Sequence, residues 1–91
     1  MLSLGKLVRN EMPVVLRVDG FKFFFFADEG SEPLHVHVEK GDSAAKFRLK
    51  PVRLSQNYGM KAPELSKVRK ILELNEKMIE GKWNEFSSRK K

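Results

Sequence analysis

The chain has 91 residues, with 18 Lys and Arg against 12 Asp and Glu, which gives a formal net charge of +6. A chain of this length is sufficient for one hydrophobic core and too short for a second domain. Because the sequence contains no cysteine, disulfides, cysteine-based zinc sites and thiol nucleophiles are excluded.

Apolar runs in the sequence, such as FFFF at residues 23–26, are far too short to cross a bilayer. The N-terminus has no apolar segment with a small-residue cleavage site of the kind that a secretory leader carries. We therefore expect a cytoplasmic protein that does not associate with a membrane. The positive charge favours an acidic partner, either nucleic acid or an acidic protein, although a surplus of this size also serves solubility alone.

The beginning of the chain differs in pattern from the rest. Residues 1–11 show no sustained hydrophobic period, and Met12-Pro13 looks like a fresh start just before a strand. We therefore predict a flexible extension over residues 1–11, a single α+β domain over residues 12–87 and a basic tail over residues 88–91.

A first β-hairpin is predicted over residues 13–26, where VVLRV and FKFFFF flank Asp19-Gly20. An Asp-Gly pair tolerates the positive φ angles of a type I′ turn, and a two-residue turn fixes the register. Residues that alternate along a strand share a face, so one face of this hairpin is wholly apolar. Its expected pairs are Val18 with Phe21, Leu16 with Phe23, and Val14 with Phe25.

The other face of the first hairpin is mixed. Arg17 lies opposite Lys22, and like charges that face each other are mildly destabilising unless an anion lies between them. Phe24 and Phe26 lie on the same face, so we expect it to be partly covered.

A second hairpin is predicted over residues 34–50, with its turn at Gly41-Asp42. If Lys40 pairs with Ser43, one face of this hairpin is apolar and the other is mostly basic. The apolar face holds Leu34, Val36, Val38, Ala45, Phe47 and Leu49. The opposite face holds His35, His37, Glu39, Ala44, Lys46 and Arg48.

The last third of the chain is predicted to be helical. Residues 52–59 fit a single helical turn that ends at Gly59, and a long helix follows over residues 63–86, with Pro63 at its first position. Its apolar stripe comprises Leu65, Val68, Ile71, Leu72, Met78, Ile79, Trp83 and Phe86. The predicted fold class is therefore α+β: a four-stranded, mainly antiparallel sheet of two hairpins, packed by one long C-terminal helix.

The two histidines of the chain lie one residue apart in the second hairpin. Residues i, i+2 and i+4 of a strand point the same way, so His35, His37 and Glu39 could supply two imidazoles and a carboxylate to a metal. The predicted register, however, places Lys46 opposite His37 and Arg48 opposite His35, and fixed cations oppose a divalent metal. A third donor from the preceding loop, Asp28 or Glu29, stays open. We predict no metal and no cofactor.

The same cations favour an anion. Two imidazoles beside Lys46 and Arg48 suit acid–base chemistry on a phosphodiester, with His35 and His37 exchanging protons. Arg17 and Lys22 extend the set of candidate anion or nucleic-acid contacts. The simpler interpretation is that the imidazoles only lie on the outer face of an edge hairpin, beside a solvated charge patch.

The FFFF run at residues 23–26 is a candidate for stacking on nucleic-acid bases. In FFFF, only Phe24 and Phe26 are free of the predicted core and available to stack. Tyr58 and Trp83 are predicted as core or cap residues.

Several motifs in combination resemble a known family. They are MP at 12–13, DGFKFFFF at 19–26, HVHVEKGD at 35–42, NYG at 57–59 and WNEF at 83–86. Over residues 12–87 the chain is similar to a small prokaryotic family of domains of unknown function, DUF4160. It departs from the family where Leu34 replaces a proline before the first histidine. It also has Lys61-Ala62 where a serine caps the long helix, which predicts a weak helix start.

The resemblance implies a component of a toxin–antitoxin-like two-gene module, with a small partner protein encoded by the neighbouring gene. It implies no catalytic residues. The first hypothesis is therefore a binding component whose sheet docks an acidic protein. The second is a metal-independent ribonuclease toxin that uses His35 and His37, with Lys46 and Arg48 holding the phosphate. The third is a nucleic-acid-binding regulator, with RNA as the partner. Whether the protein is an enzyme stays open in the sequence.

Overall fold

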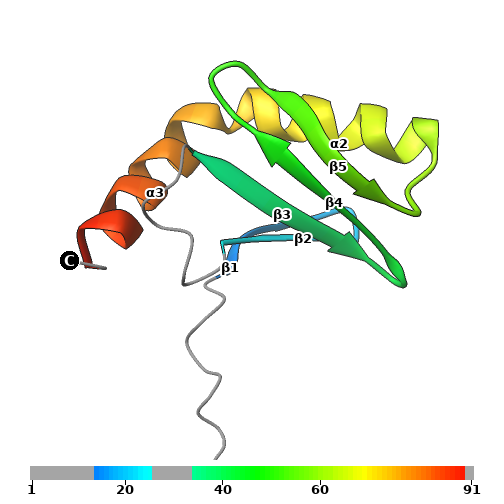
Figure 1. Cartoon of the computed structure of the whole chain (residues 1–91), viewed down its shortest axis with the longest axis horizontal. Coiled ribbons are helices and arrows are strands. Elements are labelled where there is room, and N and C mark those ends of the chain that lie inside the picture. The colour runs from blue at the N-terminus through cyan, green and yellow to red at the C-terminus, as the bar shows by residue number, and fades with distance from the viewer. Residues whose placement is uncertain (1–13, 26–33, 90–91) are drawn as a thin grey trace, which may run out of the picture.

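The computed structural model describes residues 14–25 and 34–89. Within them, five strands and two helices follow one another along the chain (Figure 1). They are β1 (Val14–Val18), β2 (Phe21–Phe24), β3 (His35–Lys40), β4 (Ser43–Arg48), β5 (Arg53–Tyr58), α2 (Ala62–Leu74) and α3 (Glu76–Arg89). The predicted extension over 1–11, the loop that holds Asp28 and Glu29, Phe26, and the last two residues of the predicted tail lie outside the described residues.

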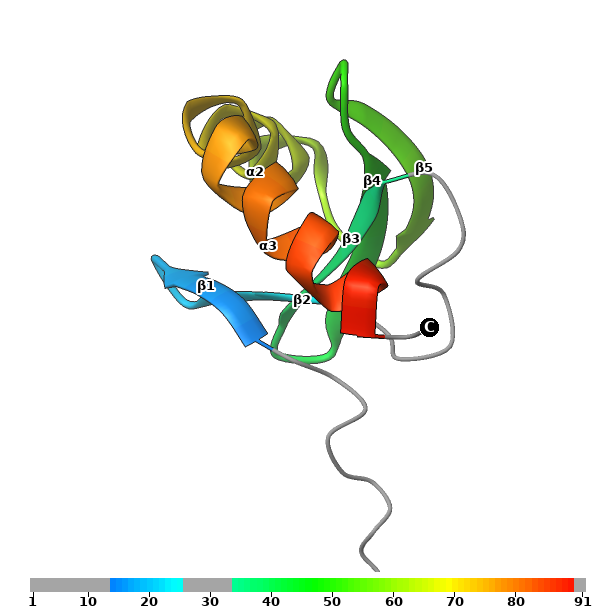
Figure 2. The same ribbon diagram turned by 90° about the vertical axis from the view of Figure 1, so that its left-hand side faces the viewer.

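The sheet is an antiparallel meander, because the order of its strands in space is their order along the chain. Figure 2 shows that the sheet twists around the helices, with β1 and β2 below them in that view and β4 and β5 to their right. The α+β class and the antiparallel sheet are thus confirmed. The prediction of four strands and one long helix was wrong, because the described residues form five strands and two helices.

The core lies between the concave face of the sheet and the two helices. From the sheet it takes Phe21, Phe23, Val36, Val38, Ala45 and Phe47, with Phe25 just after β2. From the helices it takes Val68, Ile71, Leu72, Ile79 and Trp83. Burial of this apolar area is the main source of stability. Met78, which was predicted on the same stripe, is 37% exposed.

The first hairpin turns at Asp19 and Gly20, whose φ angles are 52° and 83°. Positive φ at both positions is what a type I′ turn requires, and Gly20 reaches it at no steric cost. The pairs nearest the turn are those predicted. The outermost pair was wrong: Val14 pairs with Phe24, because a β-bulge between Val14 and Leu16 shifts the register.

The second hairpin has the predicted register throughout, from Lys40 opposite Ser43 to His35 opposite Arg48. It is not an edge hairpin, since β3 pairs with β2 and β4 pairs with β5. Both histidines therefore lie on the central strand of the sheet.

Residues 53–58 form an edge strand, where a helical turn was predicted. Their side chains are mostly exposed, and only Leu54 packs against the core. Such a strand lacks the apolar alternation that identifies a half-buried strand. A register shift opposite Lys46 and Phe47 breaks the period further.

The predicted long helix is divided at Asn75. Its side-chain amide donates a hydrogen bond to the carbonyl of Ile71 (2.8 Å), and its backbone N–H is shared between the carbonyls of Ile71 and Leu72. An Asn side chain that bonds to a nearby carbonyl in this way competes with the helix. The break redirects α3, which passes the end of the sheet where β3 begins (Figure 1).

The N-terminus of α2 is capped, although no serine precedes it. The backbone N–H of Lys61 donates to the carboxylate of Glu64 (3.2 Å), which is the second half of a capping box. Pro63 lies in the first turn, one position later than predicted, because the helix begins at Ala62. In the described part of the chain, the helices are too short or too polar to cross a bilayer.

Candidate functional site

The predicted site residues lie on the face of the sheet opposite the one that carries the core residues, and we call it the outer face. Strand pairing arranges its side chains in three rows. The rows are Arg17, Lys22 and Glu39; then Phe24, His37, Lys46 and Gln56; then His35, Arg48 and Arg53. We refer to Arg17, Lys22, Lys46, Arg48 and Arg53 as the outer cations.

His35 is a buried residue, with 3% of its surface exposed. Its imidazole lies 5.3 Å from the ring of Trp83 in α3 and 5.6 Å from the ring of His37, measured between ring centroids. The first predicted catalytic histidine is therefore enclosed by aromatic rings, at the point where α3 passes the end of the sheet.

His37 is half-buried and stacks on Phe24 from the neighbouring strand, with ring centroids 5.6 Å apart and planes inclined by 20°. The prediction that Phe24 is available to stack on a base was wrong, because only 2% of its surface is exposed. The HVHV pattern thus places both imidazoles against aromatic neighbours, which is the structural role of an amphipathic strand residue.

Glu39 is engaged by a neighbouring lysine. The Nζ of Lys22 lies 3.5 Å from a carboxylate oxygen of Glu39 and 5.4 Å from the centroid of the Phe24 ring. Lys22 therefore caps the aromatic pair through an ion pair and a cation–π contact. Both charged side chains are partly exposed, so this ion pair contributes little to stability.

The three possible metal ligands, His35, His37 and Glu39, do not form a metal-binding group in the part of the chain that the structure describes. No group of three or more His, Asp or Glu side chains close enough to hold a cation occurs there. The carboxylate of Glu39 faces Lys22, as described above, and the register places cations beside both imidazoles. The arrangement suits an anion better than a metal ion.

The remaining four outer cations differ from Lys22. Arg17, Lys46, Arg48 and Arg53 make no ion pair with any residue in the described ranges, and all but Lys46 are exposed. Arg48 and Arg53 pair directly across β4 and β5. The outer face therefore carries positive charge that the described residues leave unbalanced.

Arg53 was missed as a site residue because its strand was not predicted. The signal was present in the sequence: Arg48 and Arg53 flank LKPV, a short loop of the type that joins two strands. Tyr58 was also misplaced, since 57% of its surface is exposed, and its hydroxyl donates a hydrogen bond to the Oε1 of Gln56 (2.5 Å). Trp83 is a core residue, as predicted.

A family model described as "Domain of unknown function (DUF4160)" matches residues 20–84. The chain belongs to this family. No curated protein and no solved structure matches it. The matched range runs from the first hairpin turn into α3, and it contains every outer cation except Arg17.

One of the motifs that carried the resemblance to DUF4160 has a structural explanation. In NYG, the side chain of Asn57 donates to the carbonyl of Met60 (3.0 Å) and accepts from its N–H (2.9 Å). Gly59 has a φ of 94°, and its carbonyl accepts a hydrogen bond from the hydroxyl of Ser43 (3.0 Å). This motif shapes the turn from β5 to α2, so it needs no role in binding or catalysis.

Proposed function

We propose that this DUF4160 protein is the binding component of a toxin–antitoxin-like two-gene module, and that its outer face docks a small acidic protein. The observation that carries the proposal is the segregation of charge. Of the acidic residues in the described ranges, five lie on the helices, two at hairpin turns and only Glu39 on the outer face. The outer cations number five.

A surface field of one sign accelerates encounter with an oppositely charged partner and selects against similarly charged ones. The helices cannot supply that field, because their own Lys and Arg residues are interspersed with glutamates. An acidic protein is favoured over single-stranded RNA for a second reason. Binding of single strands relies on exposed aromatic rings, and Phe24 of the outer face is buried.

The proposal is tested by co-expressing the protein with the product of the adjacent gene and measuring the affinity of the complex. Arg17→Gln combined with Lys46→Gln is expected to weaken the complex about tenfold or more at low salt. Lys67→Gln combined with Lys70→Gln removes the same charge from exposed positions of α2 and serves as the matched control. Equal losses in the two double variants, or no complex at all, would contradict the proposal.

A metal-independent ribonuclease is the second candidate, and the pairing of His37 with Lys46 favours it. A half-buried imidazole beside an ammonium group can take a proton while the cation holds a phosphate oxygen. His35 is a poorer candidate for direct contact with a substrate, because it is enclosed. On this reading, the wild type cleaves RNA near neutral pH and arrests growth when expressed, and His37→Ala removes both effects while the protein stays folded.

A nucleic-acid-binding regulator, the third candidate, differs from the first two in how its affinity for RNA depends on salt. Such a protein would bind random RNA with an affinity that falls steeply as salt rises, and it would cut none. Binding of this kind without a protein partner would replace the first proposal.

A further inference from the structure

The turn between β4 and β5 encloses a small surface pocket of about 230 Å³. Its lining consists of Arg48, Leu49, Lys50, Pro51 and Arg53. Leu49 turns its side chain into the core, so the polar character of the pocket comes from its basic residues. The pocket lies where the outer face of the sheet meets the helices.

Arg48 and Arg53 face each other across this pocket as the last pair of the two strands. Directly opposed side chains in an antiparallel pair start from Cβ atoms about 5 Å apart, and like charges in such a pair are destabilising. Neither guanidinium has a carboxylate partner among the described residues. Two permanent cations this close create a local positive potential, which a bound anion would neutralise.

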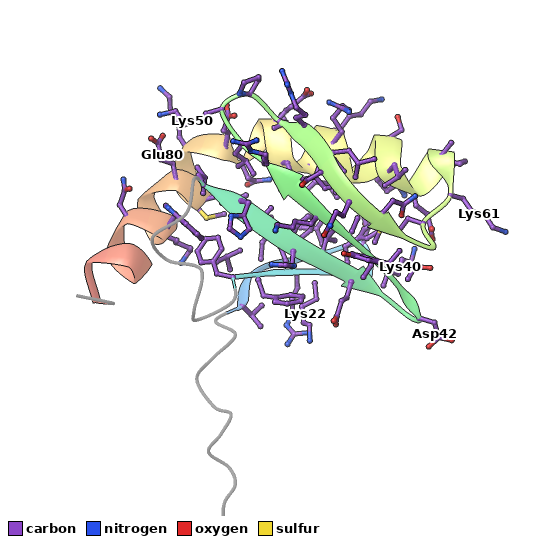
Figure 3. The ribbon with its side chains drawn as sticks, in the orientation of Figure 1. Lys22, Lys40, Asp42, Lys50, Lys61 and Glu80 are labelled. Atoms are coloured by element: carbon purple, nitrogen blue, oxygen red, sulfur yellow. The ribbon has the colours of Figure 1, made fainter. Side chains whose placement is uncertain are left out.

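Lys50, the third cation of the lining, is already neutralised. Its Nζ lies 2.6 Å from the Oε2 of Glu80, and its backbone N–H donates to the Oε2 of Glu76 (3.0 Å). Figure 3 shows Lys50 beside Glu80 at this end of the molecule. The helices therefore supply carboxylate partners to Lys50 but none to Arg48 or Arg53.

The turn is also held in place from both helices. The two glutamates of α3 bind Lys50, and Nη1 of Arg69 in α2 donates to the carbonyl of Val52 (3.1 Å). Val52 itself is buried. A site whose backbone is fixed before the ligand arrives loses less entropy on binding.

We propose that this pocket binds a phosphate monoester, with Arg48 and Arg53 as the two arms of the site. Guanidinium groups match the oxygen geometry of phosphate through paired hydrogen bonds. A phosphate monoester carries a charge near −2 at neutral pH, which neutralises both arginines, whereas a phosphodiester or a single carboxylate neutralises one. The volume of about 230 Å³ is sufficient for a phosphate and a small attached group.

The test is a titration of the full chain, followed through backbone and arginine side-chain resonances by NMR. The probes are inorganic phosphate, a nucleoside monophosphate and dimethyl phosphate. Saturable shifts centred on the β4–β5 turn are expected with the first two. Dimethyl phosphate, a monoanionic diester, is expected to bind several-fold more weakly. The difference in affinity between inorganic phosphate and the nucleoside monophosphate shows whether the site prefers free phosphate or an ester.

Arg53→Gln is expected to weaken phosphate binding about tenfold or more, the usual effect of removing a charged hydrogen-bonding partner. Lys67→Gln carries the same loss of charge at an exposed position of α2, outside the lining of the pocket, and is expected to retain binding within about twofold. Arg48→Lys keeps the positive charge but loses the paired N–H donors of the guanidinium, so it is also expected to weaken binding. Dispersed spectra of all three variants establish that they are folded.

Three results would overturn the proposal. They are an absence of saturable shifts with phosphate, an equal loss in Lys67→Gln and Arg53→Gln, and binding of RNA or of the acidic protein at the pocket without any response to phosphate. The first two results are measured on the protein alone, without a partner on the outer face. The pocket can therefore fail while the proposed function stands, and the reverse also holds.

Discussion

The indole ring of Trp83 in α3 lies 5.3 Å from the imidazole of His35 in β3. The same indole meets the ring of Phe25 edge to face, with centroids 5.0 Å apart and planes inclined by 85°. One side chain of the last helix thus joins the central strand of the sheet to the end of its neighbour. Trp83 belongs to the WNEF motif, and this contact explains why an aromatic residue is needed there.

Trp83→Ala is expected to lower the free energy of unfolding by about 3–5 kcal/mol, because it removes a large buried ring and leaves a cavity. Equilibrium denaturation with urea measures this change. Trp83→Phe keeps part of the packing and should cost clearly less. A loss below about 1 kcal/mol for Trp83→Ala would mean that α3 does not pack on the sheet as described.

Leu72 and Leu74 offer a matched pair within α2. Leu72 is fully buried, whereas 85% of the surface of Leu74 is exposed. Leu72→Ala is expected to cost about 2–5 kcal/mol of unfolding free energy, and Leu74→Ala less than about 0.5 kcal/mol. Similar values for the two variants would show that the helix presents a different side to the sheet.

Asn57→Ala is expected to destabilise the protein by about 1–3 kcal/mol. The substitution leaves the N–H and carbonyl of the buried residue Met60 without the partners they have in the turn. Ser55→Ala, on an exposed position of the same strand, should change stability by less than about 0.5 kcal/mol. Thermal unfolding of the two variants gives the comparison, and a neutral Asn57→Ala would remove the structural account of NYG.

The ion pair between Lys50 and Glu80 predicts a pH dependence. The hydrogen bond to Glu80 raises the pKa of Lys50 above its ordinary value, and the charge of the same carboxylate adds to the shift. A raised pKa in the folded state stabilises the fold below the pKa of the unfolded chain, and this stabilisation is lost as pH rises through the folded value. The melting temperatures of wild type and Glu80→Gln should therefore differ at neutral pH and converge above the lysine pKa. A difference that grows at high pH would contradict the assignment.

Sequence reasoning identified the two hairpins and the outer face because both signals are local. Asp19-Gly20 fixes one register and Gly41-Asp42 the other, and alternation then assigns each side chain to a face. His37 opposite Lys46 and His35 opposite Arg48 followed from that register and are confirmed. These are the parts of the site that a turn of two residues determines.

The parts that could not be predicted depend on tertiary contacts. β5 is recognisable only by its pairing with β4, since its side chains are mostly exposed. Asn75 breaks a helix whose apolar period continues on both sides of it, and the burial of His35 needs α3 to be redirected first. Arg53 was overlooked for the first of these reasons, and with it the second arm of the pocket.

The meander order of the strands has a consequence for how the chain acquires its fold. Every strand pairs with the strand before it, so each step of sheet formation closes a short loop and loses little chain entropy. We expect the hairpins to form early and quickly, as in proteins dominated by contacts that are near in sequence. During synthesis, the whole sheet leaves the ribosome before the helices that cover its apolar face. Until Leu72 and Trp83 arrive, that face stays open to water, and it is the surface on which aggregation would begin.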